Sequence, residues 1–112
     1  MKKIEAIIRP EKLETVVDKL SQLGYSGLHY TEIQGHGRQK GIKEVFRGRE
    51  YDVHYIPKIK IEIITIDEQA EKIIETIVNT AQTGQIGDGK IFVSEITDVI
   101  RIRTKERGEQ AV

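Results

Sequence analysis

The chain has 112 residues, and its 18 Lys and Arg residues balance its 18 Asp and Glu residues, so the formal net charge is zero. This length suits one domain with one hydrophobic core, and the zero charge disfavours a general nucleic-acid binder, which needs excess cations. The chain has no cysteine, which excludes disulfides and thiolate zinc sites. Because no apolar run approaches the roughly 18 residues of a membrane span, and no signal peptide is recognisable, we expect a cytoplasmic protein.

The first predicted elements are a strand at residues 3–8 and an amphipathic helix between Pro10 and Gly24. Pro suits the first turn of a helix, and Gly is common just after the last turn. Apolar residues recur at the spacing of one buried helical face, at Leu13, Val16, Val17, Leu20 and Leu23. A second strand is predicted at 27–34.

Residues 3–8, with the sequence KIEAII, return 57 positions later as KIEIIT, and the helical pattern returns at the same offset. The second half therefore predicts a strand at 60–65, a helix from an N-cap at Asp67 to a point before Gly84, and a strand at 90–93. We interpret this as an internal duplication of a βαβ unit. The order βαβ-βαβ predicts an α+β, ferredoxin-like split βαβ fold, as a single domain over 1–112. A last extended segment is predicted at 98–103.

Apolar residues occupy both faces of the first and third strands. Ile7 lies on the opposite face from Ile4, and Ile64 on the opposite face from Ile63. Because both helices of this fold cover the same sheet face, we expect the other face to be buried against further copies of the chain. The pattern thus predicts a homo-oligomer.

A long segment without core-forming residues separates the second and third strands. From position 35 to position 60 it carries seven basic and three acidic residues. A loop of this length is usually functional or disordered, and its charge is suited to an anion or a protein partner. A solvated hairpin extension is the alternative interpretation.

Glycine-rich turns suggest phosphate binding. The segment from Gly84 to Lys90 has the G-x-x-x-x-G-K spacing, but Ile91 replaces the Mg²⁺-binding Ser/Thr and the segment joins a helix to a strand, which disfavours a P-loop NTPase. Its backbone can still form an anion-binding nest. A second such turn follows the second strand, so the two turns could enclose a polyphosphate together with clustered cations; the residues are Gly35, Gly37, Arg38, Gly87, Gly89, Lys90, Arg101 and Arg103. Glycines that only permit a turn are the alternative.

Other classes of site find less support. The three histidines lack the spacing of a zinc site, and no G-x-S-x-G motif is present. An RNA-binding ferredoxin-like domain has the same element order and remains an alternative. It needs stacking aromatics on its central strands, and residues 58–66 contain none.

The whole chain resembles the PII nitrogen-regulatory signal-transduction proteins. The matching motifs are GHGRQKG at 35–41, PKIKIE at 57–62, TGQIGDGKIFV at 83–93 and VIRIRT at 99–104. The resemblance implies a homotrimer and a non-catalytic regulator of nitrogen metabolism. It also implies a protruding T-loop at 37–55 and a C-terminal tail at 104–112.

The resemblance implies that ATP or ADP binds in clefts between neighbouring subunits, held by Gly35, Gly37, Arg38, Glu62, Ile64, Gly87, Asp88, Gly89, Lys90, Arg101 and Arg103. With ATP bound, Gln39 would complete the shell of Mg²⁺, which 2-oxoglutarate would chelate. Lys58 would pair the distal carboxylate, and the backbone at Gln39, Lys40 and Gly41 would donate hydrogen bonds. A 2-keto acid supplies the oxygen ligands that Mg²⁺ prefers. A slow ATPase in the same cleft is the enzymatic alternative.

The resemblance further implies that the T-loop controls partner proteins, namely an ammonium transporter, nitrogen-assimilation enzymes or transcription regulators. Arg47 stands where related regulators insert an arginine into the transporter pore. Tyr51 stands where a uridylyltransferase modifies many bacterial members, but Phe46 and Arg49 depart from the usual pattern, so its modification stays open. His29 replaces a usual nucleotide-contacting threonine, and His36, Glu11 and Ile42 are further departures.

Overall fold

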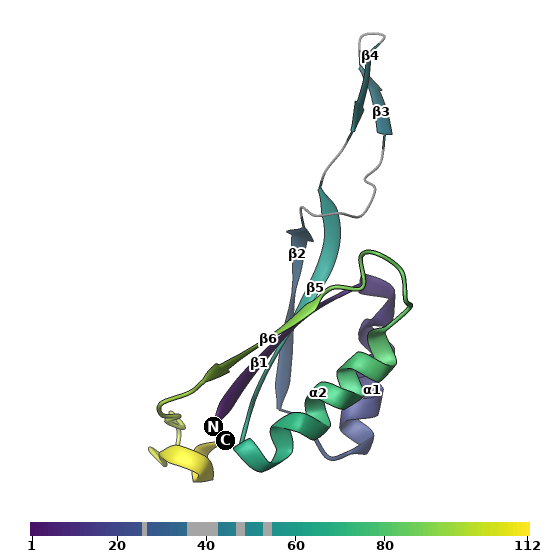
Figure 1. Ribbon diagram of the computed structural model, residues 1–112. Coiled ribbons are helices and arrows are strands. Elements are labelled where there is room, and N and C mark those ends of the chain that lie inside the picture. The colour runs from purple at the N-terminus through teal and green to yellow at the C-terminus, as the bar shows by residue number, and fades with distance from the viewer. Residues whose placement is uncertain (26, 36–42, 47–48, 53–54) are drawn as a thin grey trace.

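In the computed structural model of the chain, one antiparallel sheet of four strands carries two helices on one face (Figure 1). The structure describes residues 1–25, 27–35, 43–46, 49–52 and 55–112. The sheet order is β2-β5-β1-β6, made of β1 (Lys2–Ile8), β2 (Leu28–Gly35), β5 (Ile56–Thr65) and β6 (Lys90–Glu95). The helices are α1 (Leu13–Gln22) and α2 (Asp67–Ala81), with short 3₁₀ turns η1 (Pro10–Lys12) and η2 (Gly108–Ala111). This order confirms the ferredoxin-like split βαβ fold.

The two copies of the internal repeat lie side by side in the sheet. Strands β1 and β5 pair antiparallel, and the register sets Ile4 against Ile63 and Ala6 against Ile61. Because side chains alternate along a strand, these residues share the face that the helices cover. Their side chains are buried there with Val16 and Leu20 of α1 and Ile73 and Ile77 of α2, so the core is one layer of aliphatic residues between sheet and helices.

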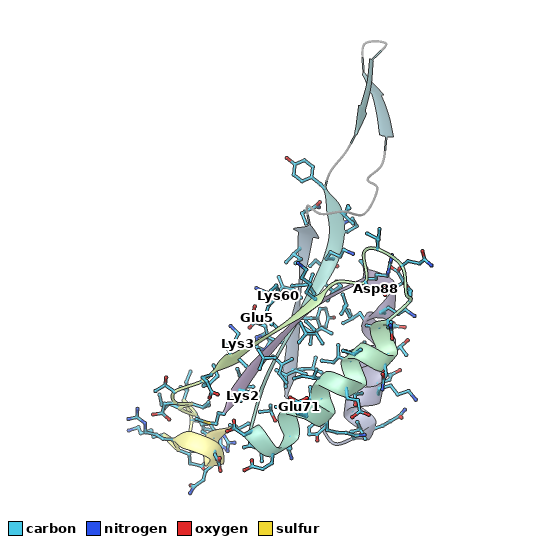
Figure 2. The ribbon with its side chains drawn as sticks, in the orientation of Figure 1. Lys2, Lys3, Glu5, Lys60, Glu71 and Asp88 are labelled. Atoms are coloured by element: carbon cyan, nitrogen blue, oxygen red, sulfur yellow. The ribbon has the colours of Figure 1, made fainter. Side chains whose placement is uncertain are left out.

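The opposite sheet face is mixed in character. It carries Lys3, Glu5 and Ile7 on β1, which pair with Ile64, Glu62 and Lys60 on β5. Figure 2 shows Lys3, Glu5 and Lys60 on the side of the sheet away from the helices. Phe92 of β6, which pairs with Glu5, is 54% exposed on this face. The homotrimer stays a prediction, for which this uncovered face is the expected contact surface.

Two local predictions are wrong. The segment 98–103 is not a strand, because the chain turns at 102–104 and folds back, with a single bridge between Ile100 and Arg107. Asp67 is not the N-cap of α2; Ile66 is, and the Asp67 carboxylate instead lies 3.0 Å from the amino group of Met1. The charged partner of that carboxylate is therefore the chain residue directly before β1, and Asp67 itself is the first residue of the helix.

Within the long segment between β2 and β5, the described residues form a separate two-stranded antiparallel sheet. It consists of β3 (Lys43–Phe46) and β4 (Arg49–Asp52), drawn beyond the ends of β2 and β5 in Figure 1. Among the described residues, no helix has both the length and the apolar character needed to cross a membrane.

Candidate functional site

The connection from α2 to β6 is a glycine-shaped loop. Gly84, Gly87 and Gly89 have φ values of 86°, 106° and 99°, a region that side chains other than glycine rarely adopt. Gly89 also lies against β1, because a Cβ built on it would be 1.7 Å from the carbonyl oxygen of Ile7. These three positions require glycine, so the sequence motif has a local conformational cause.

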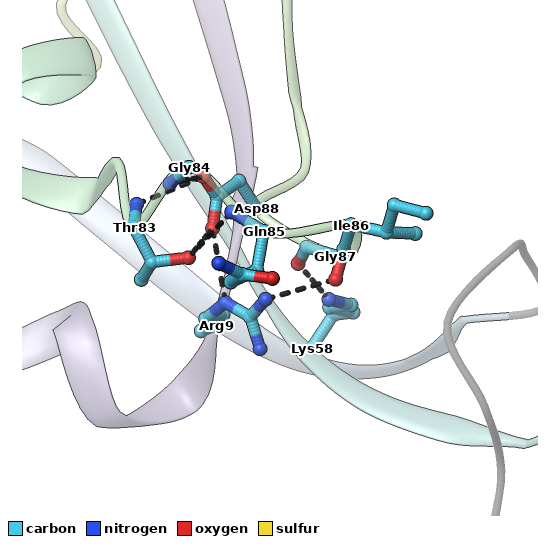
Figure 3. A network of polar contacts seen from close by, with 8 residues as sticks. All are labelled: Arg9, Lys58, Thr83, Gly84, Gln85, Ile86, Gly87 and Asp88. Carbon is cyan, nitrogen blue, oxygen red and sulfur yellow. Dashed lines mark hydrogen bonds and ion pairs between the residues drawn. The ribbon is translucent and has the colours of Figure 1, made fainter.

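The carboxylate of Asp88 organises this loop from inside (Figure 3). Its Oδ2 accepts hydrogen bonds of 2.8 Å from the backbone N–H groups of Thr83 and Gly84, and its Oδ1 accepts one from the Thr83 hydroxyl. These bonds favour the ionised form, and the Thr83 hydroxyl is the main cause that lowers the pKa of Asp88 far below its ordinary value. The hydrogen bonds to the negatively charged Asp88 side chain therefore link positions 83 and 84 to position 88 and close the loop.

Two cations from the sheet bind the same loop. Arg9, directly after β1, places Nε 3.1 Å from Asp88 Oδ1 and donates from Nη2 to the carbonyl oxygen of Ile86 at 2.9 Å. Lys58 of β5 donates from Nζ to the carbonyl oxygen of Gly87. Burial lowers the pKa of Lys58, and the charge of Arg9 adds to that effect. Figure 3 shows both side chains approaching the loop from the sheet.

The loop presents backbone donors. Within the described residues, the N–H group of Gly87 has no hydrogen-bond acceptor, and that of Asp88 follows at the end of the turn at 86–87. Successive N–H groups of this kind, beside positive charge, form a concave site for an anion. Lys90 starts β6 immediately after the loop. The chemistry of this donor set fits a phosphate.

Glu62 lies elsewhere, near the middle of the uncovered sheet face. Its carboxylate is 3.0 Å from His29 Nε2, 3.4 Å from Lys60 Nζ and 3.9 Å from Lys3 Nζ. The hydrogen bond from His29 is the main cause that lowers the pKa of Glu62. Ile64 follows on the same face and is half-buried.

The predicted arginines lie at the far end of β6 from the glycine loop. At about 3.3 Å per residue, this strand separates Lys90 from Glu95 by about 17 Å, and Arg101 and Arg103 follow beyond it (Figure 1). Arg101 pairs with Glu106 of the tail at 3.2 Å. The structure thus brings together Gly35, Lys58, Gly87, Asp88, Gly89 and Lys90, and leaves Glu62, Ile64, Arg101 and Arg103 apart from them within one chain.

Other predicted residues lie outside the described residues. These are His36, Gly37, Arg38, Gln39, Lys40, Gly41, Ile42 and Arg47, together with the side chain of Tyr51, whose backbone is in β4. Across the part of the chain that the structure describes, no group of three or more His, Cys, Asp or Glu side chains could hold a metal ion.

Sequence reasoning missed Arg9 and Thr83. A charged residue between a buried strand and Pro10 was a weak signal, because a strand end is commonly charged and exposed. Thr83 precedes the first glycine of the loop, a position where a hydroxyl often bonds the local backbone. Their shared partner, Asp88, is 79 positions after Arg9, so only the fold reveals the connection.

The fold is that of a small ferredoxin-like α+β domain, and this loop is its candidate backbone site for an anion. Residues 1–106 match the family described as nitrogen regulatory protein P-II. The chain is 56% identical to the nitrogen regulatory protein P-II of Pasteurella multocida and to that of Rhizobium meliloti, in each case over the whole of both chains. It is 55% identical to nitrogen regulatory protein P-II 2 of Methanothermobacter thermautotrophicus, over all of this chain and 97% of that relative. The chain therefore belongs to the nitrogen regulatory protein P-II family, a family of regulators in nitrogen signal transduction.

Proposed function

We propose that this regulator binds ATP or ADP with the loop at 83–90 placed against the phosphates. The observation that carries the proposal is that Arg9 and Lys58 hold a loop whose Gly87 N–H group has no acceptor among the described residues and which leads directly into Lys90. Phosphate oxygens accept such bonds, and a low-dielectric surrounding strengthens them. Lys58 is only 8% exposed, so its charge acts in such a surrounding.

The nucleotide site is proposed to form between neighbouring copies of the chain in a homotrimer. Within one chain, β6 lies between the glycine loop and the segment that carries Arg101. A second copy can supply Arg101 and Arg103 to the loop of the first. Glu62 and Ile64 lie on the uncovered sheet face, where they would meet the base and ribose at the contact between copies.

When Mg-ATP is bound, 2-oxoglutarate is proposed to bind beside it. A cavity of about 370 Å³ adjoins Lys58, lined also by Pro10, Ile33 and Pro57. Lys58 would pair the distal carboxylate there. Mg²⁺ would be held by the nucleotide phosphates, the keto acid and the Gln39 amide, and it supplies the charge that joins the two ligands. ADP lacks the γ-phosphate and should not support this site.

The protein is proposed to act without catalysis, in the cytoplasm, by changing which partners its segment 37–55 contacts. The proposed partners are an ammonium transporter, with Arg47 as the pore contact, and nitrogen-assimilation enzymes or transcription regulators. Uridylylation of Tyr51 would add a bulky anion to this segment and alter its partners. Affinity purification with ADP, with Mg-ATP, and with Mg-ATP plus 2-oxoglutarate would identify the partners that each state binds.

Calorimetry tests the ligand proposal directly. The wild-type protein should bind ADP alone, and it should bind 2-oxoglutarate only with Mg-ATP. Lys58→Met should weaken 2-oxoglutarate about 10- to 100-fold, the range expected for a lost charged hydrogen bond, and should weaken ADP less, because Lys58 acts on the phosphates only through the Gly87 carbonyl. Lys72→Met, on the exposed side of α2, is the matched control. Absence of 2-oxoglutarate binding to the wild-type protein with Mg-ATP would overturn the proposal.

A further inference from the structure

Arg9 joins two positions of the glycine loop to the end of β1. Its guanidinium contacts the Asp88 carboxylate through Nε and the Ile86 carbonyl oxygen through Nη2. A planar guanidinium can bridge two acceptors in fixed directions, which a lysine ammonium cannot do. The Arg9 side chain is 14% exposed and that of Asp88 24%, so this ion pair is more enclosed than an ordinary surface pair.

Asp88 has its oxygens occupied by the protein itself. Among the described residues, its hydrogen-bond donors are the N–H groups of Thr83 and Gly84, the Thr83 hydroxyl and Arg9 Nε. A carboxylate also repels a phosphate, because both are anions. The side chain of Asp88 is therefore suited to shaping the loop and unsuited to contacting a nucleotide phosphate.

The two cations also set the direction of two peptide planes. In a trans peptide the C=O of one residue and the N–H of the next point in opposite directions. Arg9 holds the Ile86 carbonyl toward the sheet, so the Gly87 N–H points away from Arg9. Lys58 holds the Gly87 carbonyl in the same way, so the Asp88 N–H points away from Lys58. Of these two N–H groups, that of Gly87 has no acceptor among the described residues.

We infer that Arg9 and Asp88 are positioning residues, whose ion pair holds the loop at 83–88 in the shape that presents the Gly87 and Asp88 N–H groups to an anion. This inference rests on the proposed binding of nucleotide phosphates at the loop. The arrangement removes the cost of ordering the loop when the ligand binds. Arg9 acts on the phosphate through the peptide planes and is not itself a phosphate ligand.

Amide hydrogen exchange of the ligand-free full chain tests, without any nucleotide, whether Arg9 and Asp88 hold the shape of the loop at 83–88. Arg9→Met and Asp88→Asn should raise exchange at the Thr83 and Gly84 amides at least tenfold and leave β5 amides unchanged. Lys2→Met, which removes an ion pair with Glu95 at the other end of β1, is the matched control and should change neither set. Unchanged exchange at Thr83 and Gly84 in both variants would overturn the inference, even if the protein bound no nucleotide.

Calorimetry with ADP and with adenosine tests whether the loop shape held by Arg9 affects the binding of phosphate. Arg9→Met should weaken ADP about tenfold and leave adenosine within about threefold, whereas a general folding defect would weaken both equally and contradict the inference. Arg9→Lys separates positioning from direct charge attraction. It should behave like Arg9→Met, because an ammonium cannot bridge Asp88 and Ile86. Retention of ADP affinity in Arg9→Lys would instead make Arg9 a direct electrostatic ligand.

Discussion

The backbone at Gly89 is packed against the backbone at Ile7, with only 1.7 Å between a Cβ built on Gly89 and the Ile7 carbonyl oxygen. This approach lies where β6 begins to pair with β1, since Ile7 is the register partner of Lys90. The glycine loop is therefore fixed at its downstream end by a contact that excludes any side chain.

Substitution of Gly89 by Ala should displace the loop from β1. Left-handed strain costs about 1–2 kcal/mol and forced overpacking about 1–3 kcal/mol, so we expect a loss of about 2–5 kcal/mol in the free energy of unfolding. Urea denaturation at a fixed protein concentration measures it. Gly84→Ala is the matched control, because Gly84 also has a positive φ but no atom lies within 4 Å of its built Cβ. Its cost should be the strain alone, and equal costs for the two variants would contradict this account.

Removal of the His29 imidazole should raise the pKa of Glu62 toward its ordinary value of 4.5. The hydrogen bond from His29 is the main cause of the lowered pKa, ahead of the charges of Lys3 and Lys60. Because the folded-state pKa is lowered, the interaction stabilises the protein above pH 4.5 and is lost as pH falls through the folded-state value. Carboxyl NMR titration of His29→Ala measures the shift. Lys60→Ala should give a smaller shift, and the reverse ranking would contradict the assignment.

Acid should leave the glycine loop intact well below the ordinary pKa of an aspartate. Asp88 has a strongly lowered pKa, so its contribution is complete above pH 3.8 and disappears only as pH falls through the much lower folded-state value. The amide chemical shifts of Thr83 and Gly84 should therefore show no titration between pH 7 and pH 4. A midpoint near 3.8 would mean that the hydrogen bonds from Thr83, Gly84 and Arg9 do not lower the pKa of this carboxylate.

A charge on the uncovered sheet face should prevent assembly. Phe92 is exposed in the single chain, so Phe92→Glu should leave the fold intact and disrupt the proposed contact between copies. Sedimentation should give three times the chain mass of 12.8 kDa for the wild-type protein and the single-chain mass for the variant. Leu23→Glu, which changes another exposed apolar residue at the end of α1, is the control and should remain assembled. A wild-type monomer would refute the trimer prediction.

Much of the fold could be predicted from local patterns. The alternation of Ile4, Ala6 and Ile8 matches the two-residue period of a strand, and the spacing of Val16 and Leu20 matches one helical face. The glycines at 84, 87 and 89 marked the loop because the conformations involved are local. Prediction failed at Asp67 and at 98–103, where contacts with Met1 and with the folded-back tail decide the structure.

The sequence by itself determined the element order, the buried faces and the place of the glycine loop, because these depend on residues within a few positions of one another. Only the tertiary structure decided that Arg9 bridges Ile86 and Asp88 and that Lys58 holds the Gly87 carbonyl. The register of β1, β5 and β6 brings these residues together across large sequence separations. Because such contacts depend on the pairing of the whole sheet, they cannot be predicted from the spacing of residues within one strand or helix.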